Sequence, residues 1–337
     1  MTVELNALPK AELHIHIEGA LRPELVFQLA ERNGIALPWD DVAELESEYE
    51  FSDLVSFLGL YYRCMDVLRT SDDFRDLVRD YAAHAGPQGV RHAELFFDPQ
   101  AHTSRGVAID TVIDGLLAGL EDAHAEHGLT GGLILCFVRD RPAAEAMETL
   151  ESVAGRAHQL IGVGLDSAEV GFPPELFEDV YRRAAELGLH LVAHAGEEGP
   201  ADYIRTALDV LHVERVDHGV RVLEDQDLVD RMARERIPLT VCPLSNERLR
   251  VVQRMADHPL PAMMAAGLLV TVNSDDPAYF GGYAGDNFRA LERHLGLTAE
   301  QLRGLAAASV EASFADSARK AELLDQISRW STVPSAR

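Results

Sequence analysis

Two histidines stand two residues apart in an apolar stretch near the start of the chain, Leu13-His14-Ile15-His16-Ile17-Glu18-Gly19. Successive side chains of a β-strand point to opposite faces, so His14 and His16 would share one face and the aliphatic residues the other. Burying two imidazoles without partners is costly, and a metal ion is the partner that uses both. The pair alone is also compatible with two hydrogen-bonded core histidines.

Further ionisable residues follow later apolar runs of the chain. They are Asp166 and Glu169, His194 and Glu197, Asp217 and His218, and Asp275 and Asp276. A solvated loop face would give scattered polar residues, but it would not be expected to place histidine at the last buried position of three separate runs. The pattern therefore predicts that these side chains meet at one site.

A metal site can be assembled from four of these residues. His14, His16 and His194 offer nitrogen ligands and Asp275 offers a carboxylate, a set that suits a divalent ion such as Zn²⁺ with one position left for water. The pKa of such a water falls from about 15.7 towards about 7. We expect Glu197 to act as general acid or base. His218 would orient or deprotonate the water, and Asp276 would hold the substrate.

Eight short apolar runs are predicted to be the strands that position this site. They span residues 11–17, 91–97, 132–138, 161–167, 190–195, 215–219, 238–242 and 268–274. Helical patterns separate them, and eight such βα units predict an α/β fold, a parallel (β/α)8 TIM barrel. An open doubly wound sheet is the alternative, but no G-x-G-x-x-G follows the first strand. In a barrel, catalytic residues gather at the C-terminal ends of the strands, as this pattern requires.

The chain is predicted to form a single domain over residues 1–337. Residues 22–88 look helical and lie in the loop after the first strand, so in a barrel they would cover the C-terminal mouth as a lid. The small, polar residues 331–337 are predicted to be a mobile tail.

Composition excludes several classes of protein. The net charge of −26 argues against nucleic acid or an anionic membrane surface as partner. No run has the length of a signal peptide or a membrane span, and Cys64, Cys136 and Cys242 look like reduced core residues, which together predict a cytoplasmic protein. The only lysines, Lys10 and Lys320, do not end an inner strand, so a metal pair bridged by carbamylated lysine is excluded.

Five stretches of the chain resemble the adenosine/adenine deaminase family, within the metal-dependent amidohydrolases. In order along the chain they are LPKAELHIHIEGALRPEL, HAGEEG, RVDHG, VCPLSN and TVNSDDPAYF. The resemblance spans nearly the whole sequence and implies the barrel fold. It also implies zinc on His14, His16, His194 and Asp275, with Glu197 protonating the purine nitrogen next to the amine-bearing carbon. His218 would position the hydroxide, and Asp276 would hydrogen-bond the five-membered ring.

The resemblance extends to a subgroup. Adenosine-specific members usually read H-x-H-x-D-G, with the Asp on the ribose, whereas Glu18 stands here. FFDPQAH, LDSAEVG, HAGEEGP and SDDPAYFGGY look like the bacterial and fungal adenine deaminases. The implied reaction converts adenine to hypoxanthine and ammonia by attack of zinc-bound hydroxide on C6, with one zinc per subunit, in purine salvage or catabolism. Glu18 and Gly171, with Glu169, would lie near the purine. Alternatively, Glu18 forms a salt bridge with Arg22.

Other functions stay open at this point. The same chemistry could act on adenosine or on N6-substituted adenines such as N6-isopentenyladenine, and a non-catalytic barrel that binds purine or metal is a further alternative. The expected partner is a small purine. A homo-oligomer is left open.

Overall fold

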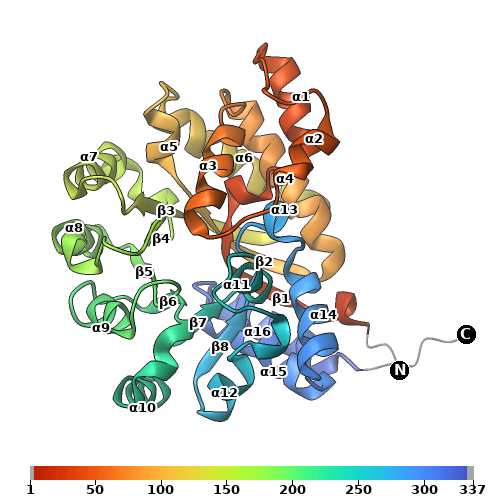
Figure 1. Ribbon diagram of the computed structural model, residues 1–337, viewed down its shortest axis with the longest axis vertical. Coiled ribbons are helices and arrows are strands. Elements are labelled where there is room, and N and C mark those ends of the chain that lie inside the picture. The colour runs from red at the N-terminus through yellow and green to blue at the C-terminus, as the bar shows by residue number, and fades with distance from the viewer. Residues whose placement is uncertain (1–3, 332–337) are drawn as a thin grey trace, which may run out of the picture.

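The computed structural model describes residues 4–331, which form an eight-stranded parallel barrel with helices on its outside (Figure 1). The strands follow one another around the barrel in sequence order, and each pairs in parallel with the next. They are β1 (Lys10–His16), β2 (Val90–Phe97), β3 (Thr130–Val138), β4 (Gly162–Asp166), β5 (His190–Ala195), β6 (Arg215–His218), β7 (Pro238–Val241) and β8 (Leu269–Val272). The predicted fold class is confirmed, and each strand agrees with its predicted range to within two residues at each end.

The barrel closes between β1 and the residue pair that follows β8. Ile15 forms a parallel bridge with Asp275. The Asp275 N–H donates to the His14 carbonyl at 3.1 Å, and the His16 N–H donates to the Asp275 carbonyl at 3.0 Å. The closure therefore fixes three of the four predicted metal ligands relative to one another through their own backbones.

Four helices occupy the segment between β1 and β2. They are α1 (Pro23–Asn33), α2 (Val42–Ser47), α3 (Leu54–Met65) and α4 (Ser71–Ala85). Capping boxes begin two of them: Asp53 and Ser56 start α3, and Thr70 and Asp73 start α4. In Figure 1 this segment lies together at one side of the barrel, in red to orange.

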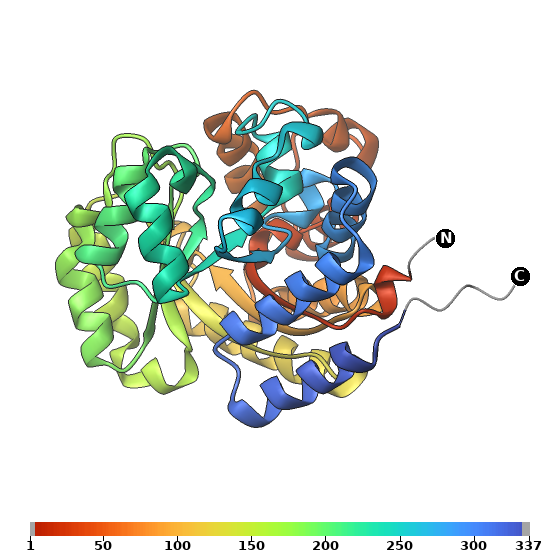
Figure 2. The same ribbon diagram turned by 90° about the horizontal axis from the view of Figure 1, so that it is seen from below.

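The remaining helices follow the later strands, and most of them surround the barrel. They are α5 (Pro99–Thr103), α6 (Ile109–His127), α7 (Ala143–Val153), α8 (Glu178–Glu186), α9 (Ala201–Asp209), α10 (Gln226–Glu235), α11 (Pro243–Arg248), α12 (Leu260–Ala265), α13 (Pro277–Phe280), α14 (Ala284–Leu295), α15 (Ala299–Ala312) and α16 (Ser317–Arg329). Helix α15 packs against β1 and β8 at the closure, and α16 packs on α15, along the blue side of Figure 2. Trp330 Nε1 then donates to the Glu4 carbonyl at 3.3 Å, which brings the two ends of the described chain together.

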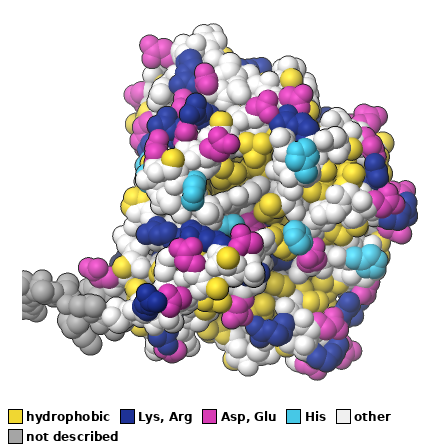
Figure 3. Space-filling model, turned by 180° about the vertical axis from the view of Figure 1, so that it is seen from behind, with side chains coloured by type: hydrophobic (Ala, Val, Ile, Leu, Met, Phe, Trp, Pro, Cys, Tyr) yellow, Lys and Arg dark blue, Asp and Glu magenta, His cyan; other side chains and the backbone are white. Residues whose placement is uncertain are grey.

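The barrel interior is partly charged. Arg215 is fully buried, and its guanidinium bonds Glu94 at 2.6 Å and the Leu13 carbonyl at 3.0 Å. The three cysteines are buried and free, as predicted. The described helices include none that is both long and apolar enough to cross a membrane. On the face in Figure 3, acidic and basic side chains are interspersed. Residues 332–337 of the predicted tail lie outside the described residues.

Candidate metal centre and active site

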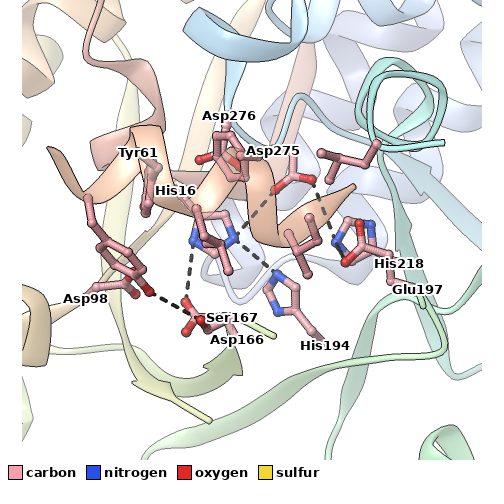
Figure 4. A pocket seen from close by; sticks show the side chains of 15 residues that line it. His16, Tyr61, Asp98, Asp166, Ser167, His194, Glu197, His218, Asp275 and Asp276 are labelled. Carbon is pink, nitrogen blue, oxygen red and sulfur yellow. Dashed lines mark hydrogen bonds and ion pairs between the residues drawn. The ribbon is translucent and has the colours of Figure 1, made fainter. Parts of the chain in front are cut away.

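The four predicted metal ligands converge at the C-terminal mouth of the barrel (Figure 4 shows three of them). The Nε2 atoms of His16 and His194 lie 3.1 Å apart. Asp275 Oδ1 lies 3.2 Å from His14 Nε2 and 3.5 Å from His16 Nε2. All four side chains are buried. The donor atoms of residues that are up to 261 positions apart in the chain thus face one small volume.

The backbone at this mouth is unusual at three positions. Ser167 has a φ of 73°, His218 a φ of 58° and Asp275 a φ of 66°, in the left-handed region that side chains other than glycine rarely adopt. Such conformations persist where the surrounding structure enforces them, and they cluster at functional sites. At Asp275 the enforcing contacts are the two hydrogen bonds to β1.

A hydrogen-bonded chain orients the ring of His14. Thr240 Oγ1 donates its single hydrogen to Asp217 Oδ1 at 2.7 Å, so it accepts from His14 Nδ1, 2.9 Å away. The proton of a neutral His14 ring is therefore on Nδ1, and the lone pair on Nε2 points to the common volume. Asp217 in turn lies 3.8 Å from Arg215 Nε and is fully buried. It is a supporting residue behind the ligands, not a loop acid.

Burial keeps the other two imidazoles neutral. It lowers the pKa of His16 to about 3 and the pKa of His194 well below its usual value. Asp166 Oδ2 lies 3.5 Å from His16 Nδ1, which favours a lone pair on His16 Nε2. Two neutral rings that face each other with Nε2 atoms 3.1 Å apart are best satisfied by a cation between them. The residues present therefore fit a divalent metal ion.

Three overlapping groups of side chains could hold a metal ion. They comprise His14, His194, His218 and Asp275; His16, Asp275 and Asp276; and His16, Asp98 and Asp166. Asp275 Oδ1 is the oxygen near His14 and His16, whereas His218 Nε2 approaches the other oxygen, Oδ2, at 3.7 Å. A cation on Oδ1 would thus be next to the predicted ligands and leave His218 on the far side of the carboxylate.

Glu197 and His218 lie together beside this centre. Glu197 Oε2 is 3.5 Å from His218 Nε2, and both residues line the pocket (Figure 4). Burial, together with the negative charges of Asp275 and Glu169, raises the pKa of Glu197 well above its usual range. Burial lowers the pKa of His218 to about 3. The raised pKa favours the protonated form of Glu197, and the lowered pKa favours the neutral form of His218.

The loop that carries Glu197 is held by the buried carboxylate of Glu169. Glu169 Oε1 accepts the N–H of Gly196 at 2.6 Å, and Oε2 accepts the N–H groups of Glu197, Glu198 and Gly199 at 3.1, 2.9 and 2.8 Å. Charge-assisted bonds of this kind are stronger than neutral ones. Glu169 thus supports the site through the backbone, and the structure places it behind the loop.

Helix α3 covers the pocket. Five residues of α3, namely Leu54, Phe57, Leu58, Tyr61 and Tyr62, line it. Tyr62 Oη lies 3.3 Å from Ser167 Oγ, at the end of β4. The free space in the pocket measures about 30 Å³, room for one or two water molecules. Aromatic residues at this spacing occur in any buried helix, so their place in the pocket could not be found from the sequence.

Of the three predicted substrate residues Asp276, Glu18 and Gly171, only Asp276 lines the pocket. Asp276 lines the pocket, and a Cβ atom on Gly19 would lie 2.0 Å from Asp276 Oδ1, so the chain needs glycine there. Glu18 is fully buried outside the pocket lining, and its Oε1 lies 2.8 Å from His102 Nε2. Gly171 is exposed and does not line the pocket.

One interpretation of the sequence needs correction, and one pocket residue was not predicted. Arg22 bonds Asp80 at 2.9 Å and not Glu18, whose partner is His102, because the loop after β1 turns Glu18 towards α5. Asp98 was not singled out by the sequence reasoning, yet it directly follows β2 and lines the pocket. The signal that could have found it is the one used for the other strands, an ionisable residue at a strand end.

A parallel barrel with imidazole and carboxylate side chains buried together at its C-terminal mouth defines a metal-dependent hydrolase of the amidohydrolase type. The chain belongs to the adenosine deaminase family, whose model matches residues 9–330. It is 61% identical over 310 residues to an adenine deaminase of Streptomyces coelicolor, covering 92% of this chain and 91% of the relative.

Solved structures give the same result. The chain superposes on the adenine deaminase of Arthrobacter aurescens with a TM-score of 0.94 and 56% identity, covering 96% of this chain and 98% of that one. An amidohydrolase of Burkhoderia ambifaria with bound Zn matches at a TM-score of 0.86 and 29% identity, covering 96% and 94%. The predicted family is confirmed.

Proposed function

We propose that this chain hydrolyses adenine to hypoxanthine and ammonia, with one Zn²⁺ per subunit held by His14, His16, His194 and Asp275. The observation that carries the proposal is the convergence of three imidazole nitrogens and a carboxylate beside Glu197 in one buried pocket. The high identity to curated adenine deaminases supports the choice of substrate. The zinc in the related amidohydrolase supports the choice of metal.

The residues of the chain divide the work of the reaction. When bound, the metal supplies a water molecule of lowered pKa at neutral pH. Glu197 donates a proton to ring nitrogen N1, which makes C6 more electrophilic. His218, 3.5 Å from Glu197 Oε2, orients the attacking water. Asp276 lines the pocket and holds N7. Water adds at C6 and loses one proton, which returns to Glu197 by way of His218. The remaining hydroxyl proton passes to the amine, the C6–N bond breaks, and ammonia leaves as C6 becomes a carbonyl carbon.

Glu197→Gln tests the role of the acid. The variant keeps the shape of the side chain but cannot donate a carboxyl proton, so kcat for adenine should fall about 10²- to 10⁴-fold with the zinc content unchanged. Turnover is followed by the loss of adenine absorbance, and metal content by elemental analysis. Glu198→Gln, the same change on the next residue, should stay within about threefold of wild type. A fully active Glu197→Gln enzyme would remove Glu197 from the mechanism.

A substrate comparison separates the remaining alternatives. The values of kcat/KM for adenine, adenosine and N6-isopentenyladenine, measured on one zinc-loaded preparation, should be highest for adenine. A preference for adenosine or for the N6-substituted base would refute the free-base assignment while leaving the deaminase chemistry intact. Absence of turnover with all three would favour a binding protein.

A further inference from the structure

Asp98 lies at the end of the pocket opposite Glu197 and His218 (Figure 4), and the mechanism above does not use it. It directly follows β2 and is 2% exposed. Its backbone N–H donates to Glu18 Oε1 at 3.1 Å, and that oxygen also lies 2.8 Å from His102 Nε2. The position of Asp98 is therefore fixed from behind by a buried pair.

One oxygen of Asp98 lacks a donor. Within residues 4–331 the buried Oδ1 has no hydrogen-bond partner, whereas the carboxyl groups of Asp98 and Asp166 are hydrogen-bonded to each other. Asp166 and His16 are ionisable neighbours of Asp98. One oxygen or nitrogen atom from each of the three side chains lies within 4.8 Å of the other two. If the two carboxyl groups share a proton, one oxygen of Asp98 still remains an acceptor. A buried acceptor without a donor is costly, so a ligand that brings an N–H group would be favoured here.

The shape of a purine determines which N–H group this is. N1 and N9 are at opposite corners of the ring system, so a base whose N1 faces Glu197 turns N9 towards the other end of the pocket. Resting on the function proposed above, we propose that Asp98 accepts the N9–H of the free base and so selects adenine over purines substituted at N9. A nucleoside has no hydrogen on N9, and its sugar would meet a buried carboxylate. A site built to accept an N–H rejects analogues that lack it.

The test compares adenine with 9-methyladenine, which differs only in the proposed contact and in one methyl group. Wild-type enzyme should prefer adenine by at least about 100-fold in kcat/KM. Asp98→Leu keeps the branched shape of the side chain but replaces the two oxygens with larger methyl groups and so removes the acceptor. It should lose about 10- to 100-fold with adenine, mainly through KM, and stay within about threefold for 9-methyladenine. Asp140→Leu, at an exposed acid after β3, is the matched control and should keep the wild-type ratio.

The ratio of the two kcat/KM values decides the outcome. An unchanged ratio in folded Asp98→Leu overturns the assignment. This includes an equal loss for both substrates, which a purely structural role would cause. If Asp98→Leu does not fold, as judged by thermal unfolding, Asp98→Asn takes its place. Its neutral acceptor should lower the ratio by a smaller factor, and an unchanged ratio is again refutation. Failure of wild-type enzyme to deaminate adenine refutes the proposed function, whereas failure of the ratio test refutes only the role of Asp98.

Discussion

Replacement of Glu169 by glutamine should show how the loop that carries Glu197 is held. The four N–H groups of residues 196–199 converge on the two oxygens of Glu169. Glutamine keeps one oxygen, and its NH₂ group would face the remaining donor. At least one buried N–H then loses its acceptor, at about 1–3 kcal/mol, and three charge-assisted bonds become neutral, at about 0.5–1.5 kcal/mol each. The loss of stabilisation is about 3–7 kcal/mol.

This loss can appear in either of two measurements. If the loop stays in place, the whole cost falls on the free energy of unfolding. With an unfolding entropy of about 2.1 cal/mol/K per residue, a chain of 337 residues gives about 0.7 kcal/mol/K, so Tm should fall by about 4–10 °C. If the loop detaches, Tm changes less, but Glu197 is displaced. A displacement of about 1 Å at a reacting group can lower kcat about 100-fold.

Thermal scans and kcat on the same zinc-loaded samples distinguish these cases. Glu198→Gln is the control, because its side chain is half-buried and makes no comparable set of bonds among the described residues. We expect its Tm within about 1 °C of wild type. A Glu169→Gln enzyme that keeps both its Tm within about 1 °C and its kcat within about threefold would show that the four bonds do not hold the site.

Two further predictions concern the metal and the substrate side of the pocket. A chelator should abolish turnover, and added Zn²⁺ should restore it. His16→Ala should lower the amount of zinc bound per chain. His190→Ala should bind zinc normally, because His190 is partly exposed and begins β5, at the end of the barrel away from the site. Normal zinc binding by His16→Ala would contradict the ligand set. Gly19→Ala should lower kcat/KM for adenine at least about tenfold, because the new Cβ would lie 2.0 Å from Asp276 Oδ1. Gly304→Ala, in open space on α15, should leave kcat/KM unchanged, and equal activity of the two variants would refute the contact.

The barrel could be predicted from the sequence because each of its strands is buried on both faces. Such strands appear as short, largely apolar runs, and ionisable residues gather at or just after their C-terminal ends. The same rule found His194, His218 and Asp275, whose positions at strand ends follow from the chain alone. Asp98 also directly follows a strand, so the same rule would have found it.

Other features depend on contacts that no local pattern encodes. The partner of Glu18 is set by how the loop after β1 packs on α5, so the sequence could not distinguish His102 from Arg22. The closure of the barrel rests on the register between β1 and Asp275, which is a long-range property. The sequence also does not show which side of α3 faces the pocket, because Tyr61 has the same spacing as residues that face the core.

Helix α3 leaves little free space in the pocket. This space measures about 30 Å³, less than a purine base needs, so we expect the side chains of α3 to shift when substrate binds. The contacts of α3 with the barrel suit such a shift, because they are largely non-directional: Phe57 packs on Phe280 with ring centroids 4.7 Å apart, and the bond between Tyr62 and Ser167 is long, at 3.3 Å. Glu197 and Asp98 follow strands of the barrel, so they would stay in place while the lid opens. Substitutions in α3 should therefore change the rates of binding and release, and substitutions at strand ends the chemical step.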